Sequence, residues 1–119
     1  MRLSLKIRFS DEAALGPGKV RLLELICETG SISAAGRELG MAYSRAWKLV
    51  NELNAIFKEP LVIAQPGGVK GGTAAVTPLG RDVITRYRSI ESDLSEHAAA
   101  QLAALDRYVR RSKRNSTQH

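Results

Sequence analysis

Two helical segments joined by a very tight turn constrain this chain more than any other feature of its sequence. Residues 33–39 and 42–56 both have helical patterns, with Ser33 as the expected N-cap of the first, and Gly40 marks the turn between them. The first segment carries small residues at positions 34–36, one of which is a glycine. A glycine inside a helix costs about 1 kcal/mol relative to alanine, so its presence predicts that the two helices pack at close range.

The residues before this pair predict a strand and a helix. Apolar and polar residues alternate strictly from Leu3 to Phe9, the period of a strand with one buried face, and its partner strand is expected further along the chain. Residues 10–17 are interpreted as a loop. A helix is expected from Lys19 to Thr29, ended by Gly30. Its inner face is predicted to consist of four apolar side chains, which include a buried structural cysteine: Val20, Leu23, Ile26 and Cys27.

A glycine-rich hairpin and a long helix are predicted after the pair. Residues 61–65 and 74–77 have strand character, and four glycines lie among the eight residues from Pro66 to Thr73. Thr77 followed by a proline is typical of a helix start. Apolar side chains then keep helical spacing toward Arg110.

Together these elements predict a mainly α fold with a small β-sheet, an α+β arrangement of the winged helix-turn-helix type. In such a fold the second helix of the pair enters the major groove of DNA, and the first helix braces it. The hairpin is the wing, and the long last helix is expected to mediate dimerisation. We expect residues 1–97 to form the DNA-binding domain with the start of the long helix, and residues 98–119 the helix end and a basic, frayed tail. An ordinary helical hairpin is the alternative that these features leave open.

The segment from Gly30 to Asn54, GSISAAGRELGMAYSRAWKLVNELN, resembles the N-terminal DNA-binding domain of the molybdate-responsive regulators of the ModE family. That domain is itself similar to the LysR-type winged helix. The glycine-rich residues 67–73 and the sequence AVTPLG at 75–80 match the wing and the start of the last helix of the same family. The resemblance covers roughly residues 1–95.

This resemblance implies a transcriptional regulator, of the repressor type, that binds its operator as a dimer. Full-length members of the family carry paired C-terminal domains that bind the oxyanion. We expect no room for such domains after the last helix of this chain. The resemblance is therefore to the stand-alone DNA-binding module, from which neither direct molybdate binding nor a cofactor is expected.

The exposed side of the second helix of the pair contains the expected base-reading residues. Ser44, Arg45 and Lys48 lie in its first two turns, away from its apolar stripe. Arg45 is predicted to read guanine through two hydrogen bonds, worth about 1–3 kcal/mol of discrimination, and Lys48 to contact guanine or phosphate. A solvated charged face is the alternative. Tyr43 is expected either to reach the DNA with its hydroxyl or to pack against the turn, and Trp47 to pack beneath the wing as a core residue.

Further contacts are expected with the DNA backbone. Ser31 and Ser33 could donate to a phosphate or only cap their helix, and Arg37 is another phosphate candidate. The wing residues expected along the minor groove are Gly68, Lys70, Gly71, Gly72 and Thr73. A nucleotide-binding loop is disfavoured, because this run does not end in Gly-Lys-Ser/Thr and does not open a helix.

Composition favours an anionic partner and argues against other functions. The chain has 18 Lys and Arg against 12 Asp and Glu, a formal charge of +6. Residues 31–90 carry eight basic and four acidic side chains, whereas residues 91–106 carry four acidic and no basic ones. No motif for catalysis or for metal binding is present, so no enzyme is predicted. One cysteine suits a reducing compartment, the cytoplasm, and no apolar run approaches the ~20 residues of a membrane span.

The leading hypothesis is therefore a regulator that binds double-stranded DNA at a pseudo-palindromic operator, as a homodimer formed by the first and last helices. The alternative is a protein-interaction or adaptor module, since winged helices also serve as docking domains. Binding of RNA or of a membrane is a more distant third, because aromatic residues make up only 5% of the chain.

Overall fold

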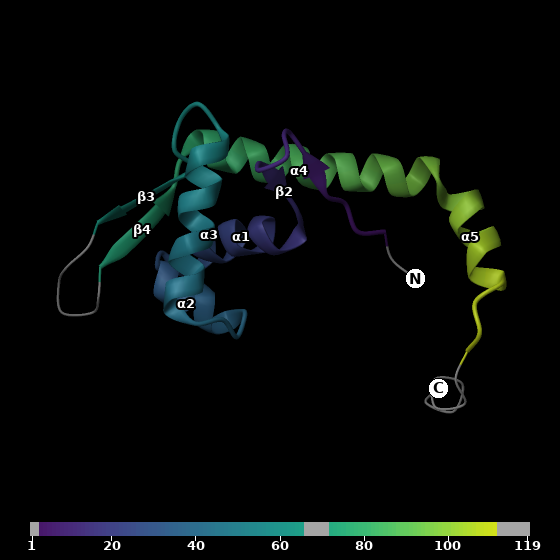
Figure 1. Cartoon of the computed structure of the whole chain (residues 1–119), viewed down its shortest axis with the longest axis horizontal. Coiled ribbons are helices and arrows are strands. Elements are labelled where there is room, and N and C mark those ends of the chain that lie inside the picture. The colour runs from purple at the N-terminus through teal and green to yellow at the C-terminus, as the bar shows by residue number, and fades with distance from the viewer. Residues whose placement is uncertain (1–2, 66–71, 112–119) are drawn as a thin grey trace.

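Helices dominate the part of the chain that the computed structural model describes, residues 3–65 and 72–111 (Figure 1). The central unit consists of three helices, α1 (Pro17–Thr29), α2 (Ile32–Glu38) and α3 (Tyr43–Ile56). An antiparallel hairpin and two further helices follow: β3 (Val62–Gln65), β4 (Thr73–Val76), α4 (Pro78–His97) and α5 (Ala99–Arg107). A short hairpin of β1 (Ile7–Arg8) and β2 (Ala14–Leu15) precedes α1. The predicted α+β fold of the winged helix-turn-helix type is confirmed.

The apolar core lies between the three central helices and the base of the β3–β4 hairpin, which is the wing. The large leucine and isoleucine side chains that are fully buried come from α1, α3 and the segment before β3, and are Leu22, Leu23, Ile26, Leu53 and Leu61. Gly30 ends α1 with a φ of 70°, as predicted for a glycine at this position. Its carbonyl accepts a hydrogen bond from the amide of Ala74 at 2.9 Å, which ties the wing to the end of α1.

One buried aromatic side chain joins α4 to the N-terminal segment, and one ion-pair cluster joins it to α1. Tyr87 is almost fully buried, and its hydroxyl donates to the carbonyl of Leu5 at 2.5 Å. Arg88 donates to both carboxylate oxygens of Glu24 on α1 at 2.9 Å, and to Glu91 at 2.7 Å. These hydrogen bonds lower the pKa of Glu24 below its ordinary value, because they favour the charged carboxylate. The start of α4 is therefore fixed to the core.

Helices α4 and α5 replace the single long helix that was predicted to run toward Arg110. Ala98 separates them with φ −95° and ψ 5°, and the chain bends there (Figure 1). Helical hydrogen bonds continue on both sides, from the amide of Ala98 to Leu94 and from the amide of Leu102 to Ala98, both at 2.9 Å. The prediction was wrong here because no glycine or proline marks the bend and the apolar periodicity runs through it.

Large apolar side chains remain exposed along these two helices. They are Ile90, Leu94 and, more exposed still, Leu105, Tyr108 and Val109 near the end of the described chain. Tyr108 exposes 82% and Leu105 62% of its surface. Among the described residues, no helix combines the length and the apolar character that a bilayer crossing requires. The described part of a single chain leaves this apolar surface uncovered.

The N-terminal strand is much shorter than predicted and pairs with the next segment along the chain. The hydroxyl of Ser10 accepts hydrogen bonds from the amides of Glu12 and Ala13 at 3.3 and 3.1 Å, which reverses the chain within what was interpreted as a loop. Ile7 then pairs with β2. Phe9 is 53% exposed and packs edge-on against Phe57, with ring centroids 5.7 Å apart. The strict alternation of apolar and polar residues correctly predicted an extended segment, but it did not predict which strand pairs with it.

Helix α1 also corrects two predictions. It begins at Pro17 rather than at Lys19, because proline fits the first helical turn, where its missing amide hydrogen is not needed. Cys27, which was predicted to be buried, is exposed. It lies at the edge of the buried face of α1, in an open groove that Arg81 and Thr85 of α4 also line.

Replacement of Gly80 by alanine is expected to destabilise the fold by about 1–3 kcal/mol. A Cβ atom there would lie 2.5 Å from the carbonyl oxygen of Leu61 and 2.6 Å from Val76 Cγ1, so α4 would have to move off the base of the wing. Gly18→Ala is the matched control, since a Cβ at Gly18 meets nothing within 4 Å. Urea unfolding measures both variants, and equal stability of the two would contradict the packing described for α4.

Candidate nucleic-acid interface

The turn between α2 and α3 holds the two helices in close contact. A Cβ on Gly36 would lie only 3.0 Å from Cβ of Ala46 on α3, so an alanine there would push the two helices apart by a few tenths of an ångström. Gly40 has a φ of 67°, a left-handed conformation that glycine adopts readily. The amide of Met41 then donates to the carbonyl of Gly36 at 3.0 Å and closes the turn. The close packing predicted from the small residues at 34–36 is confirmed.

The N-cap of α2 is Ser31 and not Ser33. The hydroxyl of Ser31 accepts a hydrogen bond from the amide of Ala34 at 3.0 Å, and the helix begins at Ile32. Ser33 therefore lies inside the first turn, where its hydroxyl accepts from Arg37 Nη1 at 3.0 Å. Both serines qualified as caps by residue type, and the residue with extended backbone dihedrals, Ser31, takes the role.

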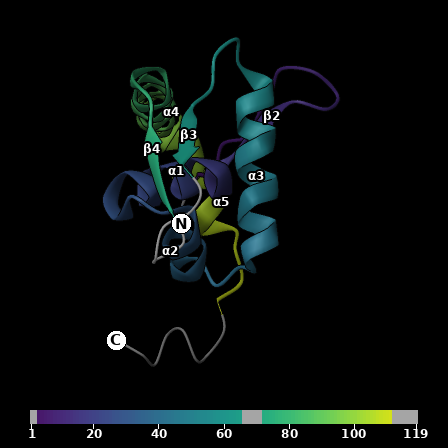
Figure 2. The ribbon, with the colours of Figure 1, turned by 90° about the vertical axis from the view of Figure 1, so that its left-hand side faces the viewer.

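Helix α3 presents its predicted base-reading residues to solvent. Figure 2 shows α3 at one edge of the domain, with no other helix on its outer side. Tyr43, Ser44, Arg45 and Lys48 are all exposed, while α3 buries Ala46, Leu49, Val50 and Leu53. Within the described residues, neither Arg45 nor Lys48 forms an ion pair with a carboxylate. The outer face of α3 therefore offers cations that are available to a ligand.

These residues line two different hollows on the exposed side of α3. Ser44 and Lys48 share a shallow groove with Tyr43 along the outer face of the helix. Arg45 instead lines a hollow at the start of α1, together with Lys6 and Lys19. Lys19 also lies 3.4 Å from Glu52 on α3. Arg45 and Lys48, three residues apart on α3, are therefore neighbours on its exposed side, with Arg45 nearer to α1.

The wing is positioned by a single side chain of α3. The amide oxygen of Asn54 accepts from the backbone amides of Leu61 and Val62 at 2.8 and 3.1 Å, and its amide nitrogen donates to the carbonyl of Val62 at 3.0 Å. Of the predicted wing residues, Thr73 is exposed at the start of β4, and Gly72 has a φ of 96°. The other three, Gly68, Lys70 and Gly71, lie outside the described residues.

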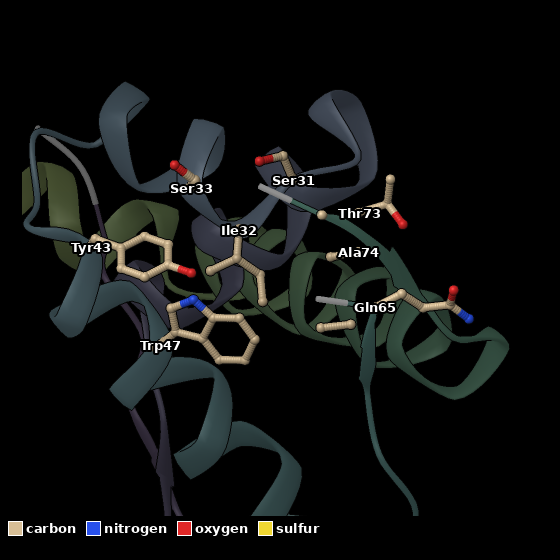
Figure 3. A pocket seen from close by; sticks show the side chains of 10 residues that line it. Ser31, Ile32, Ser33, Tyr43, Trp47, Gln65, Thr73 and Ala74 are labelled. Atoms are coloured by element: carbon tan, nitrogen blue, oxygen red, sulfur yellow. The ribbon is translucent and has the colours of Figure 1, made fainter. Parts of the chain in front are cut away.

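A small crevice forms where α2, α3 and the wing meet (Figure 3). Its volume is about 40 Å³. The polar side chains around it include four that carry hydroxyls, Ser31, Ser33, Tyr43 and Thr73, together with Trp47 and Gln65. Trp47 also packs against the hydrophobic core, as predicted for a residue beneath the wing. The sequence predicted the four hydroxyl side chains as separate contacts and Trp47 as a core residue, did not single out Gln65, and gave no signal that these residues surround a common space.

The chemistry of this surface is that of a binding site. The outer face of α3 and the crevice offer hydroxyl, amide and cationic side chains, which are hydrogen-bond donors for an anionic ligand.

His97 is exposed at the end of α4, at the far end of that helix from the wing (Figure 1). Within residues 3–65 and 72–111, no three His, Cys, Asp or Glu side chains come together in a way that could hold a metal ion.

Comparison with known families places this surface inside a recognised domain. The profile of the bacterial regulatory helix-turn-helix proteins of the lysR family matches residues 18–81, which is more than half of the chain. The match begins in the first turn of α1 and includes α2, α3, the wing and the start of α4. This family comprises regulatory proteins rather than enzymes.

Individual relatives are similar over the same region. The chain is 44% identical over 84 residues to the molybdenum-pterin-binding protein MopB of Rhodobacter capsulatus, which covers 71% of this chain and 31% of MopB. It is 39% identical over 93 residues to MopA of the same organism, which covers 78% of this chain and 35% of MopA. Identity with the DNA-binding transcriptional dual regulator ModE of Escherichia coli is 32% over 83 residues, 70% of this chain and 32% of that protein. The chain thus spans about a third of the length of these relatives.

Replacement of Asn54 by alanine is expected to destabilise the protein by about 2 kcal/mol or more, because two backbone amides at the base of the wing lose their acceptor. Asn51→Ala is the matched control, because it removes the same amide group from an exposed position of the same helix, so its loss should be clearly smaller. Urea unfolding compares the two variants. Equal losses would show that the oxygen of Asn54 does not hold the wing.

Proposed function

Because this chain belongs to the lysR family of bacterial regulatory helix-turn-helix proteins, we propose that it regulates transcription by binding double-stranded DNA through α3. The observation that carries the proposal is the exposed face of α3, which the tight α2–α3 turn holds at the edge of the domain (Figure 2). A helix held in this way can enter the major groove with its N-terminal half. One relative is itself named as a DNA-binding transcriptional regulator.

In this proposal the residues of α3 read the bases. Ser44 and Lys48 lie on the outer face of the helix, where Lys48 contacts guanine or a phosphate. Arg45, on the flank nearer to α1, reads guanine O6 and N7 with its guanidinium. Tyr43 stands at the start of the helix, 57% exposed, and reaches the edge of the groove.

Contacts with the DNA backbone set the position of the domain. Ser31 and Ser33 lie at the start of α2, and the guanidinium of Arg37 lies beside Ser33. The proposed wing contacts follow the minor groove and comprise Gly68, Lys70, Gly71, Gly72 and Thr73. Phosphate contacts of this kind fix register and orientation but carry no sequence information.

We further propose that two copies of the chain bind a pseudo-palindromic operator and repress transcription. The exposed apolar side chains of α4 and α5 support pairing between copies, because the described part of one chain does not cover them. The groove between α1 and α4 extends this surface toward the first helix. Two recognition helices would then lie about 34 Å apart, one turn of DNA.

Arg45→Ala is expected to weaken binding to a specific site by about tenfold or more, and binding to random duplex DNA much less, because a base contact is lost. Electrophoretic mobility shifts with both DNAs measure the two losses. Arg86→Ala is the matched control, since it removes the same charge from an exposed position of α4, where Arg86 pairs with Asp82. Equal losses on both DNAs would make Arg45 a phosphate contact instead.

A salt titration tests the DNA-binding function itself. Affinity for duplex DNA should fall steeply and log-linearly with salt, because each phosphate contact releases counterions. Absence of duplex binding at low salt would refute the proposed function and favour an adaptor module.

Sedimentation at micromolar concentration is expected to show a dimer, since the exposed side chains of α4 and α5 need a partner surface. Leu105→Glu should shift the equilibrium toward monomer, and Arg107→Glu, a change at an exposed polar position of the same helix, should do so much less. A purely monomeric wild-type protein would refute pairing through these helices.

A further inference from the structure

The indole nitrogen of Trp47 is a buried hydrogen-bond donor without an acceptor. Among the described residues, it is the one buried side-chain nitrogen or oxygen for which no partner is present, and it exposes less than 1 Å². Buried polar groups almost always have partners, because an unmade hydrogen bond costs the desolvation of the group. An orphan donor in a folded protein therefore requires an explanation, and a ligand that supplies the acceptor is one.

The position of this nitrogen indicates what kind of acceptor it meets. Trp47 lines the crevice between α2, α3 and the wing, and in Figure 3 its nitrogen lies on the side of the ring toward Tyr43 and α2. The hydroxyl of Ser33 accepts from Arg37, so its own hydrogen remains available to a ligand. No carboxylate is among the described side chains that line the crevice. Donors surround the space, so an anionic oxygen fits it.

We propose that one phosphate group of the DNA backbone binds at the mouth of the crevice with one oxygen inside it, and that Trp47 donates its indole N–H to that oxygen. This inference rests on the proposed function and assigns to Trp47 a DNA contact in addition to its packing role. The crevice, at about 40 Å³, has space for a phosphate oxygen and is far smaller than the several hundred Å³ of ligand pockets.

Tyr43 lies beside this nitrogen (Figure 3). Its ring packs edge-on against that of Trp47, with centroids 6.2 Å apart and an interplanar angle of 71°. Tyr43 is 57% exposed and belongs to no part of the buried core, so its ring can turn outward at little cost. The phosphate reaches the indole nitrogen when it does so. Trp47, held by the core, then fixes the position of α3 relative to one strand of the DNA.

Replacement of Trp47 by 3-benzothienylalanine tests the hydrogen bond directly. This residue has the shape of tryptophan with sulfur in place of N–H, so it removes the donor and keeps the packing. We expect duplex affinity to fall about tenfold, on specific and random DNA alike, while the thermal unfolding midpoint stays the same or rises, because the free protein loses an unpaired donor and no hydrogen bond. Trp47→Phe, made by ordinary mutagenesis, should weaken binding by at least as much. Unchanged affinity of the benzothienyl protein would refute the proposal.

A scan of the DNA distinguishes a phosphate contact from an indirect effect on the fold. One phosphate at a time is replaced by an uncharged methylphosphonate in a duplex that the wild-type protein binds. We expect the loss of affinity caused by the methylphosphonate to be smaller for the benzothienyl protein than for the wild type at one phosphate position, because the contact with Trp47 is already absent there. Additive losses at every position would overturn the proposal. Failure of the wild-type protein to bind any duplex at low salt would refute instead the function on which the inference rests.

Discussion

The close contact between α2 and α3 at Gly36 is the constraint on which the rest of the structure depends. A Cβ at Gly36 would lie 3.0 Å from Cβ of Ala46, tighter than an ordinary contact, and Gly40 and Met41 complete the turn that holds the helices there. Because α3 is held at this distance, its N-terminal half stands at the edge of the domain and its cations stay exposed. Asn54, two turns further along α3, forms hydrogen bonds with the base of the wing and so fixes the wing relative to this helix. A single helix thereby positions both surfaces proposed to meet DNA.

Basic residues are concentrated in the part of the chain that contains α3 and the wing, and acidic residues in the segment that follows it. The eight basic and four acidic side chains of residues 31–90 belong to the segment from α2 to the middle of α4, whereas residues 91–106 carry four acidic side chains and no basic one. The acidic segment lies at the opposite end of the molecule from the wing (Figure 1). On the core side of α4, Arg88 is occupied by Glu24 and Glu91, so this cation stabilises the fold rather than a ligand. The cations of α3 have no such carboxylate partners among the described residues.

Much of the fold could be predicted because local signals and tertiary packing agree. Gly30 and Gly40 both have positive φ, as their positions after helical segments indicate, and Thr77 caps α4 through the amide of Gly80. The N-cap of α2 was predicted wrongly, because the choice between two serines depends on backbone dihedrals that residue types do not specify. Ser31 and Ser33 are both suitable caps, and only the observed dihedrals select Ser31.

The remaining differences arise from contacts between distant segments. Cys27 has the spacing of a core residue, yet it faces an open groove beside α4, which a helical pattern cannot show. The crevice around Trp47 needs α2, α3 and the wing in their final places, so its members were predicted separately and by residue type alone. The assignment of individual residues to DNA contacts remains a prediction.

Selection of bound sites from random duplex DNA, followed by sequencing, tests the central claim most directly. If α3 reads bases and two copies pair, the enriched sequences should contain two inverted half-sites with centres about 10 base pairs apart, or a multiple of that spacing. Enrichment of no sequence over the starting pool would contradict base reading by the exposed face of α3.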